Sequence, residues 1–218
     1  MSLFGKREII GFGSPEFYIK EIERDVANGV IIKNHYSKKI YTATYIHLGV
    51  FLQGEMVGVL QFGYAMNPAS GGSVVSGTET DQYLELNRMW LDDRAGRNSE
   101  SMAISYCVRL IRSKFPKIKW IQSFADERCG GFGIVYQAAN FEFYGEHKAV
   151  FWTLGDEIYH NSLMTRNPKL SKSAAFLQHH KEAATCCELR QFRYIYWIDR
   201  KWMGRVLHDK KPYPKHYL

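Results

Sequence analysis

The sequence predicts a single domain of the α/β class, and three observations support this. With 218 residues and 45% apolar content, the chain can bury a substantial core. Two apolar runs, residues 45–52 and 55–65, are separated by Gln53 and Gly54, which is typical of a β-hairpin. Between residues 84 and 145 the pattern becomes strand, polar turn, helix, strand and short helix, an order of elements that can hold a group donor. We expect the rest of the chain to be organised around this stretch.

Net charge and cysteine spacing limit the classes of function. The formal charge of +7 favours an anionic partner but does not distinguish DNA, RNA, a membrane or an acidic cofactor. The four cysteines show no CxxC spacing, and the sequence has neither a secretory signal nor an apolar run of bilayer length. We expect a cytoplasmic protein with reduced thiols and no membrane partner.

The segment that begins at Ser14 has the start and stop signals of a surface helix packed on the sheet. Ser14 is a suitable N-cap, and Gly29 can end the helix. The apolar residues Ile19, Ile22 and Val26 would then share one helix face.

Two loops flank the predicted hairpin. Residues 34–45 combine polar, aromatic and basic side chains, which suits a loop that approaches a charged ligand, and a solvated surface loop is the alternative. Residues 67–81 form a long loop rich in small residues, either a mobile lid or filler. The chemically active members of the first loop are His35, Tyr36, Lys38 and Lys39.

A phosphate site is predicted where the strand at residues 83–91 leads through a turn into the helix at residues 102–115. The strand carries polar and apolar groups on both faces, as strands that line a site commonly do. Free N–H groups at the helix start, the helix dipole and two arginines together make a cradle for phosphate. The alternative is an ordinary N-cap that binds nothing. The candidate donor-binding residues are Arg88, Arg94, Gly96, Arg97, Asn98, Ser99 and Ser101.

A buried strand that begins near Ile118 ends in polar groups. Ser123 and Asp126 stand at or just past its carboxyl end, where ligands bind in α/β sheets. A lone aspartate before a glycine pair is more often a turn former, but this one shares a short run with other polar residues. A short helix with Tyr136 and Gln137 follows and turns into another strand.

The C-terminal third is less informative. Residues 147–164 and 192–207 predict late strands, a basic insertion lies between them at about 165–190, and an extended basic arm follows at about 208–218. The insertion could contact DNA phosphates, and a solvated insertion is the alternative. Zinc is disfavoured because the usual two-residue gaps are missing from the pairs His179, His180, Cys186 and Cys187.

A helix with a tyrosine, a run of small residues and then "NF" before a strand is similar to the fourth-helix motif of the GNAT acyltransferase superfamily. More specifically, NHYSKKI, LGVF, LNRMWL, RNSES and SFADERCGGFGIVYQAANFEFYG together resemble the phage Mom family of DNA-modification proteins. The resemblance covers about residues 34–145 and extends to FRYIYWIDRKW. It implies a GNAT-like, mixed and mainly antiparallel central sheet flanked by helices.

The resemblance also implies a function. The expected product is adenine in phage DNA that carries a carbamoylmethyl group on N6, which protects the DNA from restriction in the infected bacterium. That group has the atoms of a glycyl unit, so simple acetyl transfer cannot make it. Glycyl-tRNA and acetyl coenzyme A are the candidate donors, and Gly96 alone in the turn departs from the family's coenzyme A motif.

By the same resemblance, Tyr136 would be the acid that protonates a leaving group. The adenine must be flipped from double-stranded DNA or presented on a single strand. Asp126 could then accept the N6 proton, and His35 or Tyr36 could position the purine. Iron has been associated with the family, and His35, Tyr36 and Asp126 include possible ligand types. No ligand spacing here is diagnostic, so no metal site is predicted and iron stays an open alternative. The candidate catalytic residues are Asp126, Tyr136, Ser123, His35 and Tyr36, and the candidate substrate-binding residues are Lys38, Lys39, Asn87, Gln137 and Asn140.

Two other classes of function remain as alternatives. One is an acetyl-coenzyme-A-dependent N-acetyltransferase on a small amine or a protein, which would be indifferent to DNA. The other is a non-enzymatic DNA-binding protein, which would bind DNA in a salt-sensitive way and leave nucleosides unmodified. The sequence does not indicate the DNA context or the oligomeric state.

Overall fold

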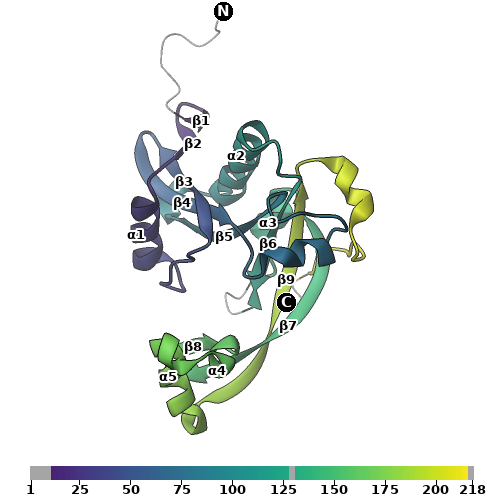
Figure 1. Ribbon diagram of the computed structural model, residues 1–218. Helices are drawn as coiled ribbons and strands as arrows, with labels where there is room; N and C mark the ends of the chain where they lie inside the picture. The colour runs from purple at the N-terminus through teal and green to yellow at the C-terminus, as the bar shows by residue number, and fades with distance from the viewer. Residues whose placement is uncertain (1–10, 128–130, 216–218) are drawn as a thin grey trace, which may run out of the picture.

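The structure is a computed structural model that describes residues 11–127 and 131–215, and within these ranges nine strands form one sheet (Figure 1). The strand order is β1-β2-β3-β4-β5-β6-β9-β7-β8, and every neighbouring pair except β5–β6 is antiparallel. The predicted mixed, mainly antiparallel sheet is therefore confirmed. The strands are β1 (Phe12–Gly13), β2 (Phe17–Glu21), β3 (Thr44–Leu52), β4 (Glu55–Gly63), β5 (Tyr83–Leu91), β6 (Trp120–Asp126), β7 (Glu142–Leu154), β8 (Glu157–His160) and β9 (Thr185–Trp197).

The parallel pair β5–β6 opens into a V at the centre of the sheet. These two strands stay together for three residue pairs, the last of which is Glu85 with Gln122. Beyond that pair β5 remains bonded to β4 as far as Leu91, whereas β6 remains bonded to β9 as far as Asp126. Because the inner edges of the diverging strands leave the ladder, their peptide groups become available to a ligand.

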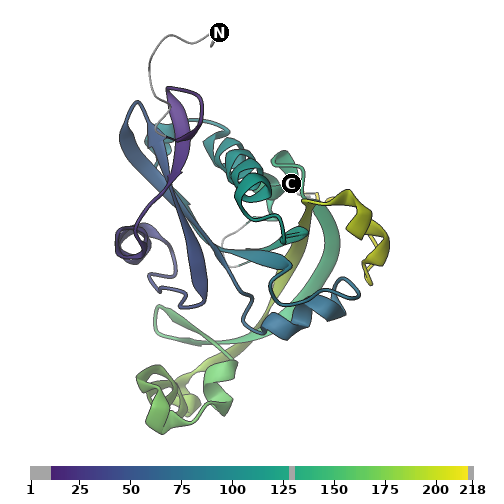
Figure 2. The same ribbon diagram turned by 45° about the horizontal axis from the view of Figure 1, so that its top comes forward.

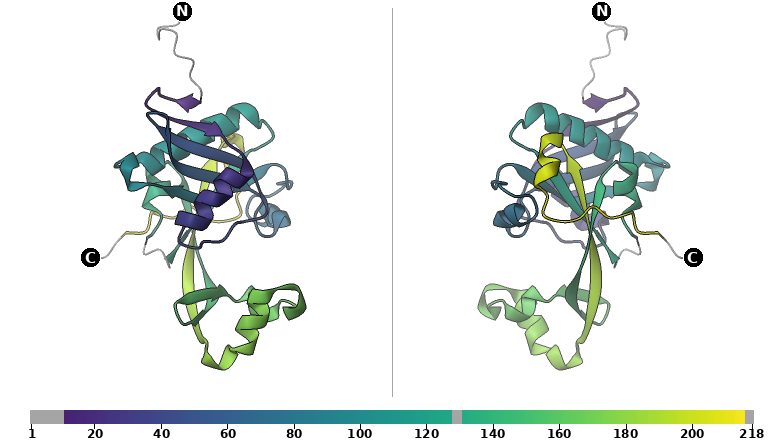
Figure 3. Two further views of the ribbon diagram at one scale, coloured as in Figure 1. Left: turned by 90° about the vertical axis from the view of Figure 1, so that its left-hand side faces the viewer. Right: turned by 90° about the vertical axis from the view of Figure 1, so that its right-hand side faces the viewer.

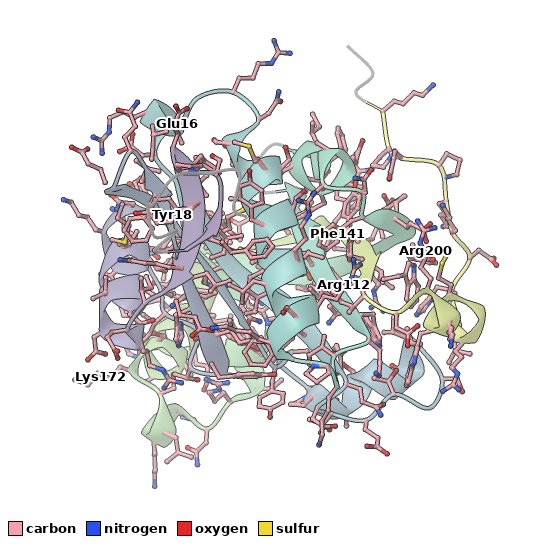
Figure 4. All side chains as sticks on the ribbon, turned by 90° about the horizontal axis from the view of Figure 1, so that it is seen from above. Glu16, Tyr18, Arg112, Phe141, Lys172 and Arg200 are labelled. Atoms are coloured by element: carbon pink, nitrogen blue, oxygen red, sulfur yellow. The ribbon has the colours of Figure 1, made fainter. Side chains whose placement is uncertain are left out.

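Helices α2 (Ser99–Lys114) and α3 (Ile134–Ala138) cover one face of the sheet, here called the α2 face (Figure 2). Figure 4 looks onto this face, where α2 crosses the strands. The apolar spacing predicted for α2 is confirmed, because its buried residues pack on the strand residues Leu84, Leu86 and Ile121. These α2 residues are Ala103, Ile104, Cys107, Val108, Leu110 and Ile111.

Other elements cover parts of the opposite face. Helix α1 (Arg24–Asn34) packs Ala27 and Ile31 against Val59 and the partly buried Trp90. The 3-10 helices η1 (Pro68–Ser73) and η6 (Arg200–Arg205) flank a second cluster around Tyr83 and Trp120, whose rings stack 4.5 Å apart. No helix in the described ranges is both long and apolar enough to cross a membrane.

The loop at residues 67–81 is packed filler, which decides between the two alternatives given above. Val74 and Val75 are buried, and Val75 forms a β-bridge with Val206. The hydroxyl of Tyr83 donates to the carbonyl of Pro68 at 2.9 Å, so the loop is fixed to the sheet.

Strands β7 and β9 run together beyond the main body and carry β8 and the small helices α4 (Ser162–Thr165) and α5 (Lys172–His179) (Figure 3). We call residues 147–190 the arm. The predicted basic insertion is thus folded, with the 3-10 turns η4 (Pro168–Leu170) and η5 (Lys181–Ala183) beside α5. The strand predicted at 192–207 ends at Trp197, because η6 follows it, and the C-terminal segment then lies along β7, where the amide of Lys211 donates to the carbonyl of Phe143 at 2.8 Å.

The helix predicted from Ser14 is wrong. The Ser14 hydroxyl both accepts from the amide of Phe17 and donates to its carbonyl, which makes a tight turn instead of a helix cap. Residues from Phe17 onward form β2 on the edge of β3, and Ile19 is fully buried there. The helix begins later, at Arg24, and Gly29 lies inside it. Pairing with β3 buries more apolar surface than a surface helix would, so tertiary contacts override the local pattern.

Candidate active site

Polar side chains line the face opposite α2 where the V opens. Gln122 contacts Glu85 across the two parallel strands, and Phe124 lies under the guanidinium of Arg193, 5.4 Å from its ring centre. Side chains alternate along a strand, so Asp126 points to the same face as these two β6 residues. We call this group the polar strip, and its members are Glu85, Asn87, Gln122, Asp126, His147 and Arg193.

Glu85 is the centre of the polar strip. Its carboxylate accepts from Nε2 of Gln122 at 2.9 Å and from Nδ2 of Asn87 at 3.1 Å. Burial raises the pKa of Glu85 to about 6, although the two amides, Arg88 and Arg193 act in the opposite direction. The strip therefore holds a carboxyl group that changes charge near neutral pH.

Three buried atoms of the polar strip have no hydrogen-bond partner among the described residues. They are Oδ1 of Asn87, Oε1 of Gln122 and Nη1 of Arg193. Buried polar groups in native proteins are nearly always paired, because an unpaired one costs about 1–3 kcal/mol. Three of them on adjoining side chains indicate a place for a polar ligand.

The far end of the strip combines a carboxylate with a neutral imidazole. Asp126 is 8% exposed, and the ring of His147 meets Phe124 edge-on at 5.5 Å. Burial, together with the nearby charge of Arg193, lowers the pKa of His147. His147 and Asp126 lie on either side of Gln191 of β9, and a neutral histidine in such a polar strip is suited to hydrogen bonding or proton transfer.

The loop at residues 35–43 lies against this face. His35 is buried at the end of α1, and its Nδ1 accepts from the amide of Ser37 at 3.1 Å. The ring of Tyr36 lies 4.2 Å from that of His35 and is 59% exposed. Arg88 donates from Nε to the carbonyl of Lys39 at 3.1 Å, which ties the loop to β5.

Lys39 also connects the loop to the arm. Its Nζ lies 3.9 Å from a carboxylate oxygen of Glu157 and 5.4 Å from the ring centre of Tyr159, both on β8. Beside it, burial and the charge of Glu85 raise the pKa of Tyr41 to about 12, so its hydroxyl stays protonated. The loop thus lies between β5, which Arg88 ties to it, and β8 of the arm, which Lys39 contacts. This position is consistent with the predicted approach of the loop to a polar site.

The turn before α2 keeps the features expected of an anion site. Gly96 and Asn98 have positive φ angles of 82° and 66°, and Asn98 forms no side-chain cap on the helix. Arg94 is engaged with Asp92 at 3.1 Å, whereas Arg97 is exposed. The hydroxyl of Ser99 donates to the carbonyl of Gly96 and that of Ser101 to the carbonyl of Asn98, so the helix start offers backbone N–H groups rather than hydroxyls.

Ser123 and Tyr136 lie on the α2 side of the sheet, away from Asp126. Ser123 is fully buried, and its hydroxyl lies 3.4 Å from the carbonyl of Leu86, across the start of the V. The ring of Tyr136 packs 5.4 Å from that of Tyr194. Gln137 donates to the Tyr194 hydroxyl at 3.0 Å, and Asn140 has a φ of 63° where α3 ends. The predicted catalytic residues therefore occupy both sides of the V rather than one wall of a cleft.

Sequence reasoning missed Glu85, Gln122, His147 and Arg193. The signal available was a set of polar residues inside otherwise apolar strands, for example Glu85 between Leu84 and Leu86. That signal did not show that the strands meet, because β6 and β9 are separated by the whole arm. Arg128 and Cys129, which flank the end of β6, lie outside the described residues.

The described residues do not assemble an iron site. Within residues 11–127 and 131–215 no three His, Cys, Asp or Glu side chains gather in a way that could hold a metal ion. His35, one of the possible ligands, uses Nδ1 to accept from Ser37. We therefore derive no chemical step through a metal.

The titration of Glu85 gives a test of this environment. Because the folded state raises its pKa from 4.5 to about 6, the folded protein binds this proton more tightly than the unfolded chain. The free energy of unfolding should fall as the pH rises through this window, by about 2 kcal/mol at most. The variant Glu85→Gln should lose this fall, as measured by urea denaturation at a series of pH values.

The matched control for that experiment is Glu142→Gln. Burial raises the pKa of Glu142, but hydrogen bonds from Lys210, Tyr144 and Trp197 outweigh it and lower the pKa overall. The Glu142 contribution therefore has the opposite sign and is lost as the pH falls. If Glu85→Gln left the pH dependence of unfolding unchanged, the carboxyl group would be solvated rather than buried.

Solved structures with the same architecture are acetyltransferases. The ribosomal-protein-S5-alanine acetyltransferase from Vibrio fischeri aligns with a TM-score of 0.52 at 10% identity, over 88% of this chain and 98% of its own. An acetyltransferase from Salmonella typhimurium that modifies the N-terminal serine of ribosomal protein L7/L12 aligns with a TM-score of 0.51 at 14% identity, over 85% and 97%. The fold is that of the GNAT acyltransferases, as expected from the sequence.

Sequence comparison then gives the family. The model of the Mom protein family matches residues 16–215, so the chain belongs to that family. It is 44% identical over 211 residues to the methylcarbamoylase Mom of Escherichia phage Mu, and the match covers 95% of this chain and 88% of that protein.

Proposed function

We propose that the protein is a DNA-modifying transferase that converts adenine in phage DNA to N6-carbamoylmethyladenine. The relative from phage Mu is named a methylcarbamoylase, and the GNAT fold is used by acyltransferases. One structural observation carries the proposal. The V between β5 and β6 separates a helix start suited to phosphate from a strip of buried polar groups suited to a base.

In this arrangement the donor and the acceptor come from opposite faces. The phosphates of the donor's carrier bind at the start of α2, near Arg97 and Asn98, and the acyl group enters the V. The target adenine is flipped out of double-stranded DNA, or taken from a single strand, and enters from the face of the polar strip. A paired base could not reach the V, because its amino group is enclosed in the duplex.

The carbamoylmethyl group has the atoms of a glycyl unit, so the donor in this proposal is an activated glycyl group, for which glycyl-tRNA is our candidate. Adenine N6 attacks the glycyl carbonyl carbon, the ester bond to the carrier breaks, and the carrier leaves as its hydroxyl form. The free glycyl amine then attacks purine C6. The bond from C6 to the original N6 breaks, and that nitrogen leaves the ring as the primary amide. The second step is an isomerisation, so it needs no further reactant.

The proposed role of each catalytic residue follows from the face of the sheet on which it lies. Asp126, on the strip, accepts the proton that N6 loses on attack. Tyr136, on the α2 side, donates a proton to the departing carrier. His35 and the exposed Tyr36 position the purine ring, for which an aromatic side chain offers a stacking surface.

DNA is the proposed macromolecular substrate, and basic residues near the site support this. Lys38 is exposed at the tip of the loop, with a φ of 47°. The arm adds exposed cations at Arg166, Lys169, Lys172 and Lys181. Such side chains bind phosphates without reading sequence and make binding sensitive to salt.

The experiment that tests the proposal is mass analysis of nucleosides from the DNA of bacteria that express the protein. We expect a modified deoxyadenosine whose added mass equals one carbamoylmethyl group, and resistance of that DNA to restriction. Unmodified nucleosides together with salt-sensitive DNA binding would identify a binding protein instead. Unmodified nucleosides together with tight coenzyme A binding would identify an acetyltransferase with another acceptor.

A further inference from the structure

Glu85 fixes the orientation of two side-chain amides. An ionised carboxylate only accepts hydrogen bonds, so both Gln122 and Asn87 must turn their NH2 groups toward it. Asn87 uses the same NH2 group to donate to the carbonyl of Tyr64 at 3.2 Å. The amide oxygens of both residues are therefore directed away from Glu85. The need of the carboxylate for hydrogen-bond donors fixes which amide atom is oxygen and which is nitrogen.

These two oxygens are acceptors that the fold leaves unused. Gln122 is 3% exposed and Asn87 is 9% exposed, so water has little access to either amide. Nη1 of Arg193, also buried and unpaired, adds one donor. Arg193 pairs across the strands with Phe124, which follows Gln122 on the same face of β6. The three orphan groups therefore belong to neighbouring positions on this face.

The charge around the orphan groups disfavours a cationic ligand, and the two orphan acceptor oxygens disfavour an anion. Arg88 and Arg193 both act on Glu85, so its negative charge is already balanced by two guanidinium groups. A ligand ammonium group would meet two cations for one carboxylate and would be disfavoured. Aromatic rings lie on both sides, Phe124 beneath Arg193 and Tyr41 beneath Arg88. The site thus suits a flat, neutral molecule with two adjacent donors and one acceptor.

We propose that this cluster is the pocket that recognises the amino edge of adenine, with Glu85 as a positioning residue that sets its preference for an amino over a keto purine. The inference rests on the proposed DNA substrate and names the residues that read the base. Before the attack the two N6–H groups donate to the oxygens of Gln122 and Asn87, and Nη1 of Arg193 donates to a ring nitrogen. When N6 attacks, one of these hydrogen bonds is given up and that proton passes to Asp126. Hypoxanthine and guanine present a keto oxygen at that position, which would face two acceptors and be rejected.

Glu85→Gln gives a specific test, because a glutamine carries one acceptor and one NH2 donor. One of the two amides keeps its orientation, and the other must rotate to accept from the new NH2 group. The rotated amide then presents its own NH2 group to the pocket. The pocket changes from two acceptors to one acceptor and one donor, which matches the keto oxygen and ring N–H of hypoxanthine.

The measurement is the affinity of the full-length protein for short, thymidine-rich single strands that contain one central adenine, hypoxanthine or unsubstituted purine. The neighbouring positions are mixtures of C, G and T, so that the strands cover many DNA contexts without a second adenine. Binding is followed by fluorescence anisotropy. Wild type should bind the adenine strand about tenfold more tightly than either of the others. In Glu85→Gln the ratio of adenine to hypoxanthine affinity should fall by about tenfold or more.

Glu142→Gln serves as the control, since Glu142 is also a partly buried strand carboxylate that accepts from side chains, and it should keep the adenine preference. The inference is contradicted if the wild-type protein binds the three strands equally. It is also contradicted if the wild-type protein binds none of them. A folded Glu85→Gln variant that retains the full adenine preference would contradict it too, as would thermal stabilisation of wild type by glycinamide but not by 9-ethyladenine. If the cells nevertheless contain modified nucleosides, any of these results would contradict only the assignment of this pocket, and the proposed function would still hold.

Discussion

Bacteria that express the protein and receive glycine labelled with heavy nitrogen are expected to yield a modified adenine with the label on the nitrogen attached to purine C6. In the proposed reaction the glycyl amine displaces the original N6, which becomes the unlabelled amide. Fragmentation of the nucleoside in a mass spectrometer separates the two nitrogens, because the amide is lost as ammonia. Glycine also labels the purine ring during synthesis, so unmodified deoxyadenosine from the same DNA gives the baseline. The expected outcome is one heavy nitrogen above that baseline, which is retained after the loss of ammonia.

A parallel culture with carbon-labelled glycine controls for uptake, since two labelled carbons above the level in unmodified deoxyadenosine should enter the added group whatever the order of nitrogen attachment. Nitrogen label found only in the lost ammonia would rule out the rearrangement. Absence of both labels would rule out a glycyl donor. Neither result would contradict the proposal that adenine in DNA is the acceptor, because the mass of the modified nucleoside tests that proposal separately.

Asp126→Asn and Tyr136→Phe are each expected to lower the amount of modified nucleoside by about a hundredfold or more, the usual effect of removing a general acid or base. Asp126→Asn removes the acceptor for the N6 proton at the end of the strip. Tyr136→Phe removes a proton donor but keeps the ring contacts with Phe141 and Tyr194. The measurement is the ratio of modified to unmodified deoxyadenosine at equal protein levels.

Two matched substitutions show whether such losses are specific. Asp156→Asn changes an exposed aspartate in the turn between β7 and β8, and Tyr196→Phe changes a second tyrosine whose ring packs on Phe141. Both should leave the amount of product unchanged. Wild-type product from Asp126→Asn would show that another group accepts the N6 proton, and wild-type product from Tyr136→Phe would show that the carrier leaves without this acid.

Local patterns predicted the elements whose contacts are close in sequence. The hairpin β3–β4 follows from two apolar runs around Gln53 and Gly54, and Gln53 adopts the positive φ of 51° that a tight turn requires. Helix α2 follows from its apolar spacing, because its buried stripe faces a sheet whichever strands compose it. By contrast, β2 was misread as a helix, since its partner β3 lies more than twenty residues further along the chain.

The candidate site was only partly visible in the sequence for the same reason. Asp126 and the loop with His35 and Tyr36 stood out as short polar runs beside apolar strands. Arg193 lies between Phe192 and Tyr194 in β9, and nothing near it in the sequence indicates that it faces Phe124. Ser123 and Asp126 are neighbours in the same short run, but the alternation of the strand places them on opposite faces.

By itself, the sequence determined the class of the fold and the family, because both are written in contiguous residues. It placed the start of α2 three residues too late, since the helix begins at Ser99 rather than Met102. Only the tertiary structure decided which polar groups share a site. Glu85, Gln122 and Arg193 meet because three strands distant in the chain align in one register, and the hydrogen bonds that orient them exist only after that alignment. The physical reason is that a strand shows which residues share its face, whereas the strand pairing decides what that face meets.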